Sequence, residues 1–84
     1  MLDRVAAADK LVDFVRQFAP GLPEGEMARE ANLPDAGLTS LSAVKLMLAL
    51  EAEYSLIIPD EELTPGNFGT VGAIDAMITR LRAG

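Results

Sequence analysis

Ser40 is the residue whose surroundings in the sequence most suggest chemistry. It lies where a loop segment, DAGLT, meets an apolar segment, SLSAVKLMLALE, at residues 40–51. A serine hydroxyl acts as a nucleophile when a nearby base takes its proton, yet the 84 residues include no His and no Cys. Lys45 follows five positions later, and on a helix it would point in a different direction from Ser40. Ser40 therefore has no evident base of its own.

Two interpretations of Ser40 follow from its position alone. In the first, Thr39 or Ser40 is a helix N-cap, because Ser and Thr at that position accept hydrogen bonds from unpaired backbone N–H groups. In the second, Ser40 carries a covalent group. The free N–H groups and the positive end of the helix dipole stabilise a phosphate, so a phosphodiester would suit this position.

The acidic run Asp60, Glu61 and Glu62 is the other candidate for chemistry. Paired carboxylates in a cleft can perform acid–base catalysis, but three consecutive acids on a turn are typical of a solvent-exposed surface. The run also lacks the alternating oxygen ligands and the glycine of an EF-hand calcium loop. We therefore predict that the chain holds no metal and is not an enzyme.

The net charge of −6 is concentrated on both sides of Ser40. Residues 19–39 carry four acids against one base, and residues 40–63 carry five acids against one base. Such acidity excludes a nucleic-acid partner, since phosphates require a basic face, and it should attract basic partner enzymes. No apolar run reaches membrane-spanning length, and the N-terminus does not resemble a signal peptide. We expect a cytoplasmic location without membrane insertion.

Apolar periodicity predicts the helices that position Ser40. They are expected at residues 3–17, 40–54 and 70–82, with a short one at 60–64 that Asp60 caps. Thr70 is the expected N-cap of the last helix. In the first helix the inward residues are Leu11, Val12, Val15 and Phe18; in the second they are Leu41, Val44, Met47, Leu48 and Tyr54, widened by Leu46 and Leu50.

The segment between the first two helices, residues 19–39, is rich in Pro and Gly and is predicted to be a long functional loop. Its apolar residues are expected to fasten it over the core; they are Leu22, Met27, Leu33 and Leu38. No alternation of apolar and polar residues is long enough to predict a β-sheet. The sequence therefore predicts one all-α domain over residues 1–84, a small bundle of three main helices plus one short helix, expected to be a monomer.

The run GLTSLSAVKLMLALEAEYSLIIPDEEL, followed by FGTVGAIDAMI, resembles the acyl carrier protein family. The resemblance covers roughly residues 31–82 and depends on an ordered set: Gly37, Ser40-Leu41, Leu50-Glu51 before Tyr54, and Thr70-Val71. It implies that a Mg²⁺-dependent phosphopantetheinyl transferase attaches 4′-phosphopantetheine from coenzyme A to Ser40. The terminal thiol of that arm then holds a thioester, which would supply the sulfur that the chain lacks. The implied role is that of a carrier and not of a catalyst.

Three positions depart from the family pattern. The residue before the serine is Thr39 where the family usually has Asp, and Ser42 and Lys45 stand where fatty-acid carriers are commonly acidic. Rim charges govern which partner docks and how fast, so we expect weak recognition by standard fatty-acid synthase enzymes. The residues expected to face partners are Thr39, Leu41, Ser42, Lys45, Met47, Glu51, Glu53, Asp60, Glu61 and Glu62.

Three functions remain open at this point. The first is a discrete acyl carrier protein in a specialised lipid or secondary-metabolite pathway, with an acyl-loading ligase and downstream synthase or transferase enzymes as partners. The second is an aminoacyl or peptidyl carrier loaded by an adenylating amino-acid ligase. The third is a non-catalytic helical adaptor in which Ser40 is only a cap. Met47 and Met77 are interpreted as ordinary core residues, although they could part to shelter an acyl chain.

Overall fold

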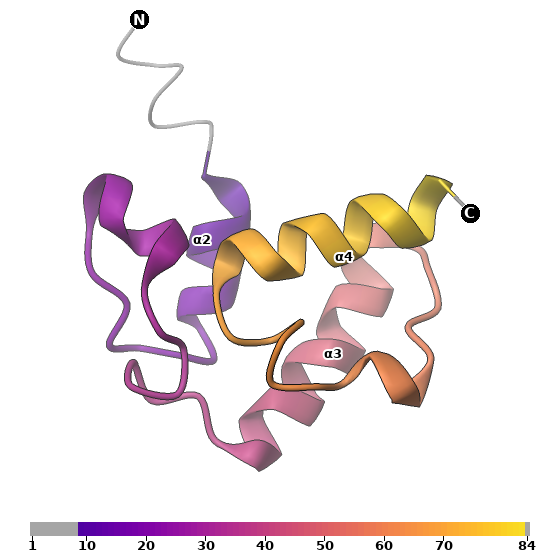
Figure 1. Cartoon of the computed structure of the whole chain (residues 1–84), viewed down its shortest axis with the longest axis horizontal. Coiled ribbons are helices and arrows are strands. Elements are labelled where there is room, and N and C mark those ends of the chain that lie inside the picture. The colour runs from indigo at the N-terminus through magenta and orange to yellow at the C-terminus, as the bar shows by residue number, and fades with distance from the viewer. Residues whose placement is uncertain (1–8, 84) are drawn as a thin grey trace, which may run out of the picture.

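The computed structural model describes residues 9–83, and these form an all-helical domain (Figure 1). The elements are α2 (Lys10–Arg16), the 3-10 helix η1 (Gly25–Glu30), α3 (Ser40–Tyr54), the 3-10 helix η2 (Asp60–Glu62) and α4 (Val71–Ala83). α4 runs along the long axis, α2 and η1 lie near the end where α4 begins, and α3 slopes across the other side (Figure 1). The described range contains no strand, in agreement with the predicted all-α fold.

The two long helices lie where the periodicity predicts them. α3 spans Ser40–Tyr54, and α4 begins one residue later than expected, at Val71. The predicted cap of α4 is present, because the Thr70 Oγ1 accepts the Ala73 N–H at 3.0 Å. The first helix ends at Arg16, and its expected start near Asp3 lies outside the described residues.

The short helix η2 differs from its prediction. It ends at Glu62, two residues before the expected end, and Pro59 in an extended conformation precedes it without a side-chain cap bond. Asp60 therefore does not cap this turn. A three-residue 3-10 turn closes with backbone hydrogen bonds alone, such as that from the Glu62 N–H to the Pro59 carbonyl at 2.9 Å.

The long segment before α3 is more ordered than its sequence predicts. It contains η1, which lacks the apolar period of an α-helix because its sequence is GEMARE. Leu22, Leu33 and Leu38 are buried as expected, but Met27 is 68% exposed, so its predicted core role is wrong. Ala28 and Ala36 enter the core instead. A six-residue 3-10 helix turns one small residue inward and leaves its larger neighbour outside.

The inward face of α3 also differs from the prediction. Leu46, Met47 and Leu50 are buried, whereas Leu41 is 66% exposed, Leu48 is 55% exposed and Val44 lies at the boundary of exposure. The prediction that all of the apolar residues face the core is therefore wrong. A helix at the edge of a small domain buries one stripe of its surface, and α3 has more apolar residues than one stripe accommodates.

Arg29 connects η1 to the start of α2 and to α4 through two ion pairs. Its Nε donates to Asp9 Oδ1 at 2.8 Å, and its Nη1 donates to Asp75 Oδ2 at 3.1 Å. These contacts link η1 to the residue before α2 and to the middle of α4. The ion pairs, together with the packing of α2 and η1 on α4, hold this end of the bundle.

Candidate functional site

The residues around Ser40 form a capping box that does not use the Ser40 hydroxyl. The Thr39 Oγ1 accepts the Ser42 N–H at 3.1 Å, and the Ser42 Oγ accepts the Thr39 N–H at 2.7 Å. Thr39 is therefore the N-cap, and Ser40 is the exposed first residue of α3. No hydrogen bond of the Ser40 hydroxyl occurs within residues 9–83. Of the two residues that the sequence proposes as a cap, Thr39 performs that role and leaves Ser40 available.

Gly37 directs the chain into α3. Its φ of 105° lies in a region that side-chain-bearing residues rarely adopt. Directly after it, Leu38 is buried and donates its N–H to the Leu33 carbonyl at 2.9 Å. The turn at Gly37 and the buried side chain of Leu38 together determine that the helix begins at Ser40. This gives a physical reason for a glycine three residues before the serine.

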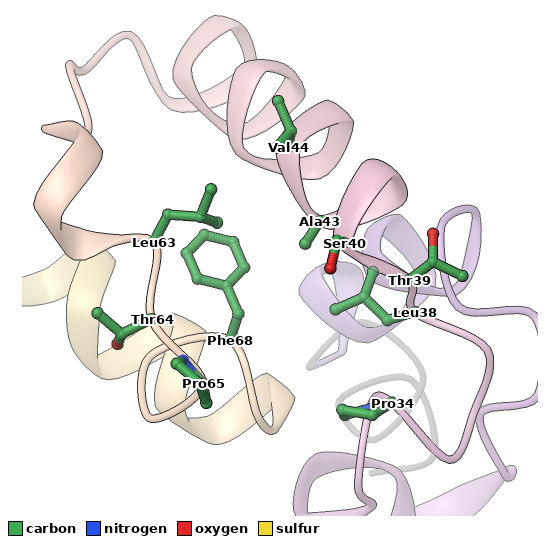
Figure 2. Close-up of a pocket in the computed structure, with 10 residues that line it drawn as sticks. All are labelled: Pro34, Leu38, Thr39, Ser40, Ala43, Val44, Leu63, Thr64, Pro65 and Phe68. Atoms are coloured by element: carbon green, nitrogen blue, oxygen red, sulfur yellow. The ribbon is translucent and has the colours of Figure 1, made fainter.

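A groove of about 330 Å³ opens beside Ser40. Figure 2 shows Ser40, Ala43 and Val44 of α3 facing the segment of residues 63–68, which forms the opposite wall. We name this hollow the Ser40 groove. Its lining consists of Pro34, Leu38, Thr39, Ser40, Ala43, Val44, Leu63, Thr64, Pro65 and Phe68, none of which carries a charge.

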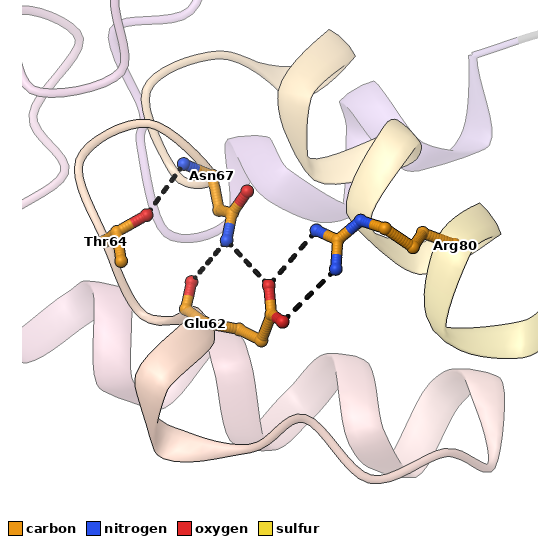
Figure 3. Close-up of polar contacts among 4 residues, drawn as sticks. All are labelled: Glu62, Thr64, Asn67 and Arg80. Carbon is orange, nitrogen blue, oxygen red and sulfur yellow. Dashed lines mark hydrogen bonds and ion pairs between the residues drawn. The ribbon is translucent and has the colours of Figure 1, made fainter. Parts of the chain in front are cut away.

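The opposite wall of the Ser40 groove is braced to α4 (Figure 3). Arg80 donates from Nη1 and Nη2 to the two carboxylate oxygens of Glu62, each at 3.1 Å. The Asn67 Nδ2 donates to the Glu62 carbonyl and to its Oε1, both at 2.8 Å, and the Asn67 N–H donates to the Thr64 Oγ1. The Arg80 guanidinium lowers the pKa of the Glu62 carboxyl. These contacts hold the segment that carries Leu63 and Phe68.

The residues predicted to face partners fall into two sets. The first set is exposed to solvent and consists of Leu41, Lys45, Glu53, Asp60 and Glu61. The others are engaged within the chain: Thr39 and Ser42 form the capping box, Met47 is buried, Glu51 accepts the Ile58 N–H at 2.8 Å, and Glu62 holds Arg80. The sequence reasoning missed Leu48, which lies one turn beyond Val44 and is exposed. The excess of apolar residues on α3 was the signal that could have revealed it.

The site fits a phosphopantetheine group by the chemistry of its residues. An exposed hydroxyl stands on the first residue of a 15-residue helix, where the first N–H groups have no partners in the helix and favour a phosphate. An uncharged groove beside it can hold the pantetheine part of the arm, which carries no charge. Within the described part of the chain, no cluster of acidic side chains could bind a metal ion. Likewise, no helix among the described residues is long and apolar enough to cross a bilayer.

Comparisons with known proteins assign the chain to a family. Residues 10–78 match the family described as phosphopantetheine attachment site. Aminoacyl carrier protein 2 of Bradyrhizobium diazoefficiens is 51% identical over 49 residues, which are 58% of this chain and 55% of the relative. The aminoacyl carrier protein of Agrobacterium fabrum is 38% identical over 53 residues, 63% of this chain and 64% of the relative. The matches therefore span less than two thirds of each relative's length.

Two solved complexes contain chains of the same fold. One holds an engineered Bradyrhizobium japonicum glycine:[carrier protein] ligase with a carrier protein from Agrobacterium tumefaciens and ATP; the match has a TM-score of 0.67 and 30% identity, covering 83% of this chain and 92% of the other. The other holds the Bradyrhizobium japonicum ligase with glycylated carrier protein; its TM-score is 0.60 at 35% identity, covering 89% and 97%. With the family match over residues 10–78, these findings make the chain a member of the phosphopantetheine-attachment-site family, which implies a covalently attached 4′-phosphopantetheine.

Proposed function

We propose that Ser40 is the residue that bears the 4′-phosphopantetheine arm, and that the arm carries an amino acid as a thioester. An adenylating amino-acid ligase would load it, as in the second of the functions that the sequence leaves open. The single observation that supports attachment at Ser40 is the capping box. Thr39 and Ser42 form the hydrogen bonds that cap the start of α3, and they leave the Ser40 hydroxyl exposed.

The chain's own residues define what it contributes to attachment. None of the residues lining the Ser40 groove is titratable as a general base near neutral pH, so the transferase must accept the proton of the Ser40 hydroxyl. The start of α3 supplies N–H groups and a positive potential that stabilise the resulting phosphodiester. The attached group supplies a thiol that forms thioesters, and the chain itself contains no cysteine that could compete for the cargo.

The similar proteins favour an amino acid as the cargo. The similar proteins are named aminoacyl carriers, and the similar solved complexes contain a glycine ligase. The exposed start of α3 lacks acidic residues and carries Lys45, whereas the family resemblance implies acidic residues at positions 42 and 45 of fatty-acid carriers. The α-ammonium of an aminoacyl group would stay in solvent, because burying it in an uncharged groove is unfavourable.

An acyl cargo is the second candidate, and one observation favours it. The Ser40 groove is lined largely by apolar side chains, including Leu38, Val44, Leu63 and Phe68, and such a lining would bury part of a short acyl chain. This function is the one that the sequence alone put first. The two candidates share the attachment step and differ only in the ligase and the cargo.

The attachment is tested by intact-protein mass spectrometry after incubation with coenzyme A, Mg²⁺ and a broad-specificity phosphopantetheinyl transferase. The wild-type chain should gain one 4′-phosphopantetheine group. Ser40→Ala should gain nothing, whereas Ser42→Ala, two residues away, should still be modified. Modification of Ser40→Ala, or none of the wild type, would contradict the assignment.

The cargo is tested on the modified protein. Incubation with ATP, glycine and the Bradyrhizobium japonicum glycine:[carrier protein] ligase should add the mass of one glycyl group, and hydroxylamine should remove it as expected for a thioester. A parallel reaction with a fatty-acid ligase and short fatty acids should add nothing. Loading by the fatty-acid ligase alone would favour the second candidate.

A further inference from the structure

The wall of the Ser40 groove that faces α3 is held at both of its ends. Just before it, the Nη1 and Nη2 of Arg80 on α4 donate to the two carboxylate oxygens of Glu62 (Figure 3). Just after it, the Gly69 carbonyl accepts the Leu33 N–H at 2.8 Å. The wall is therefore connected to α4 at one end and to the segment before α3 at the other.

Within the wall, the chain folds into a hydrogen-bonded turn. The Thr64 Oγ1 accepts the Asn67 N–H at 3.1 Å, and the Thr64 carbonyl accepts the Phe68 N–H at 3.0 Å. The Asn67 Nδ2 also donates to Glu62 Oε1 at 2.8 Å, so it connects the turn to the carboxylate that Arg80 binds. A guanidinium that donates two bonds to one carboxylate fixes geometry as well as charge. The turn can therefore move away from α3 only if these bonds break.

Burial fixes the side of the groove that α3 forms. Leu46 and Leu50 of α3 are fully buried, and Phe68 of the wall is buried as well. Side chains packed in a core do not separate to admit a further group without losing their contacts. The room in the groove is about 330 Å³, which lies at the lower end of the range of about 300–1,000 Å³ for small-molecule sites.

We infer that Glu62, Asn67 and Arg80 are positioning residues that keep the Ser40 groove from widening and so limit the cargo that it shelters to short groups. None of the three lines the groove, and they act through the wall. This inference rests on the proposed function and specifies its cargo as an amino acid with little or no apolar side chain, such as glycine. A long acyl chain would find room beside the pantetheine only if the wall moved away from α3. In a groove that could widen, each further buried methylene would favour the sheltered state about fourfold.

The test attaches acyl chains of increasing length to Ser40 and measures the melting temperature of each product. A broad-specificity phosphopantetheinyl transferase is supplied with coenzyme A or with its acetyl, butyryl, hexanoyl or decanoyl thioester, so that no ligase is needed, and mass spectrometry verifies each product. The chains compared are the wild type, Arg80→Gln, Asn67→Ala and Arg82→Gln. Arg82 is the matched control, because it is also an exposed residue of α4 but forms no ion pair within residues 9–83.

We expect the melting temperatures of the wild type and Arg82→Gln to stay within about 1 °C between the butyryl and decanoyl forms. In Arg80→Gln and Asn67→Ala they should rise with chain length, by roughly 4–8 °C over the same series, because a loosened wall lets more of the chain leave water. Each rise is measured against the same variant with an unacylated arm. A role in stability alone would lower all forms of a variant equally and would produce no rise.

Contrary results separate this inference from the proposed attachment. A steady rise with chain length in the wild type would overturn the inference and leave the attachment intact. A flat series in either Arg80→Gln or Asn67→Ala would also overturn it, because the network would then not be what limits the groove. An equal rise in Arg82→Gln would attribute the effect to the charge of α4 and would overturn it as well. A wild type that gains no arm would instead contradict the attachment at Ser40.

Discussion

The start of α3 and the junction of α2, η1 and α4 use polar side chains in opposite ways. At the junction, Arg29 pairs with both Asp9 and Asp75. At the start of α3, the capping box is neutral, the Ser40 hydroxyl has no partner in residues 9–83, and Lys45 has no ion pair there. The charge of Arg29 is thus paired where three elements meet, whereas that of Lys45 has no partner in residues 9–83 on the helix that Ser40 begins.

This difference teaches how the chain separates stability from recognition. The position of Ser40 depends on backbone geometry and a neutral cap, which leaves the surrounding charges free to vary without loss of the fold. The junction contains specific charge pairs that contribute to stability. Substitutions at the two regions should therefore change different measurements.

The largest expected effect comes from Gly37→Ala. At a φ of 105°, an added Cβ strains the backbone, and that Cβ would also lie 3.4 Å from the Pro20 Cδ. We expect a loss of about 2 kcal/mol in the free energy of unfolding, measured by urea denaturation. The rate of phosphopantetheinylation should fall as well, because the turn that orients Ser40 is distorted.

Gly66→Ala is the matched control for this change. Gly66 lies in the groove wall, and a Cβ there would meet only the Thr64 Oγ1 at an ordinary 3.8 Å. Stability and modification rate should both stay near those of the wild type. If the two alanine variants behaved alike, the turn at Gly37 would not be what positions Ser40.

Arg29→Ala should destabilise the junction and spare the site. The substitution removes both ion pairs, but the Arg29 side chain is 35% exposed, so solvent screening limits the loss in unfolding free energy to about 1–1.5 kcal/mol. Arg29→Lys should recover part of it, since a lysine cannot reproduce the forked contact to two acids. The modification rate at 25 °C should be unchanged in both, and a slower rate would mean that the two regions are coupled.

Thr39→Ala should have a smaller effect on stability, of about 1 kcal/mol. It leaves the Ser42 N–H without its acceptor at the start of α3. Thr39→Ser keeps the oxygen and should restore the wild-type melting temperature. In both variants the transferase should still modify Ser40, and complete loss of modification in Thr39→Ala would contradict the division of labour between cap and attachment residue.

The helices were predictable from the sequence because their apolar residues repeat at helical spacing. Local interactions determine both the cap at Thr70 and the extent of α3. The cap depends on a hydrogen bond within four residues, and the helix depends on the spacing of its apolar residues. The position of Ser40 at the start of α3 follows from the same information. The identity of the cap required the structure, because Thr39 and Ser40 are both suitable by residue type.

The features that the sequence did not give depend on tertiary contacts. η1 has no apolar period, and it is held by Arg29 through partners 20 and 46 residues away. Likewise, whether Leu48 faces the core or solvent depends on which side of α3 its neighbours cover. Glu51 and Glu62 look like other surface acids in the sequence, but the structure pairs them with the Ile58 N–H and with Arg80.

Glu62→Gln tests whether a charge pair also matters at the wall of the Ser40 groove. The Arg80 guanidinium lowers the pKa of Glu62 in the folded chain, so the stabilisation from this pair is complete above the ordinary carboxyl range and is lost as the pH falls through the lowered pKa. The wild type should melt above Glu62→Gln at pH 7, and the gap should close below about pH 4. Glu61→Gln, one residue earlier and exposed, should show no gap at either pH. A gap for Glu62→Gln that persisted at pH 3 would mean that the hydrogen bonds accepted by the side chain, and not its charge, hold the wall. The charge pairs that stabilise the chain would then be those of Arg29 and not the pair at the Ser40 groove.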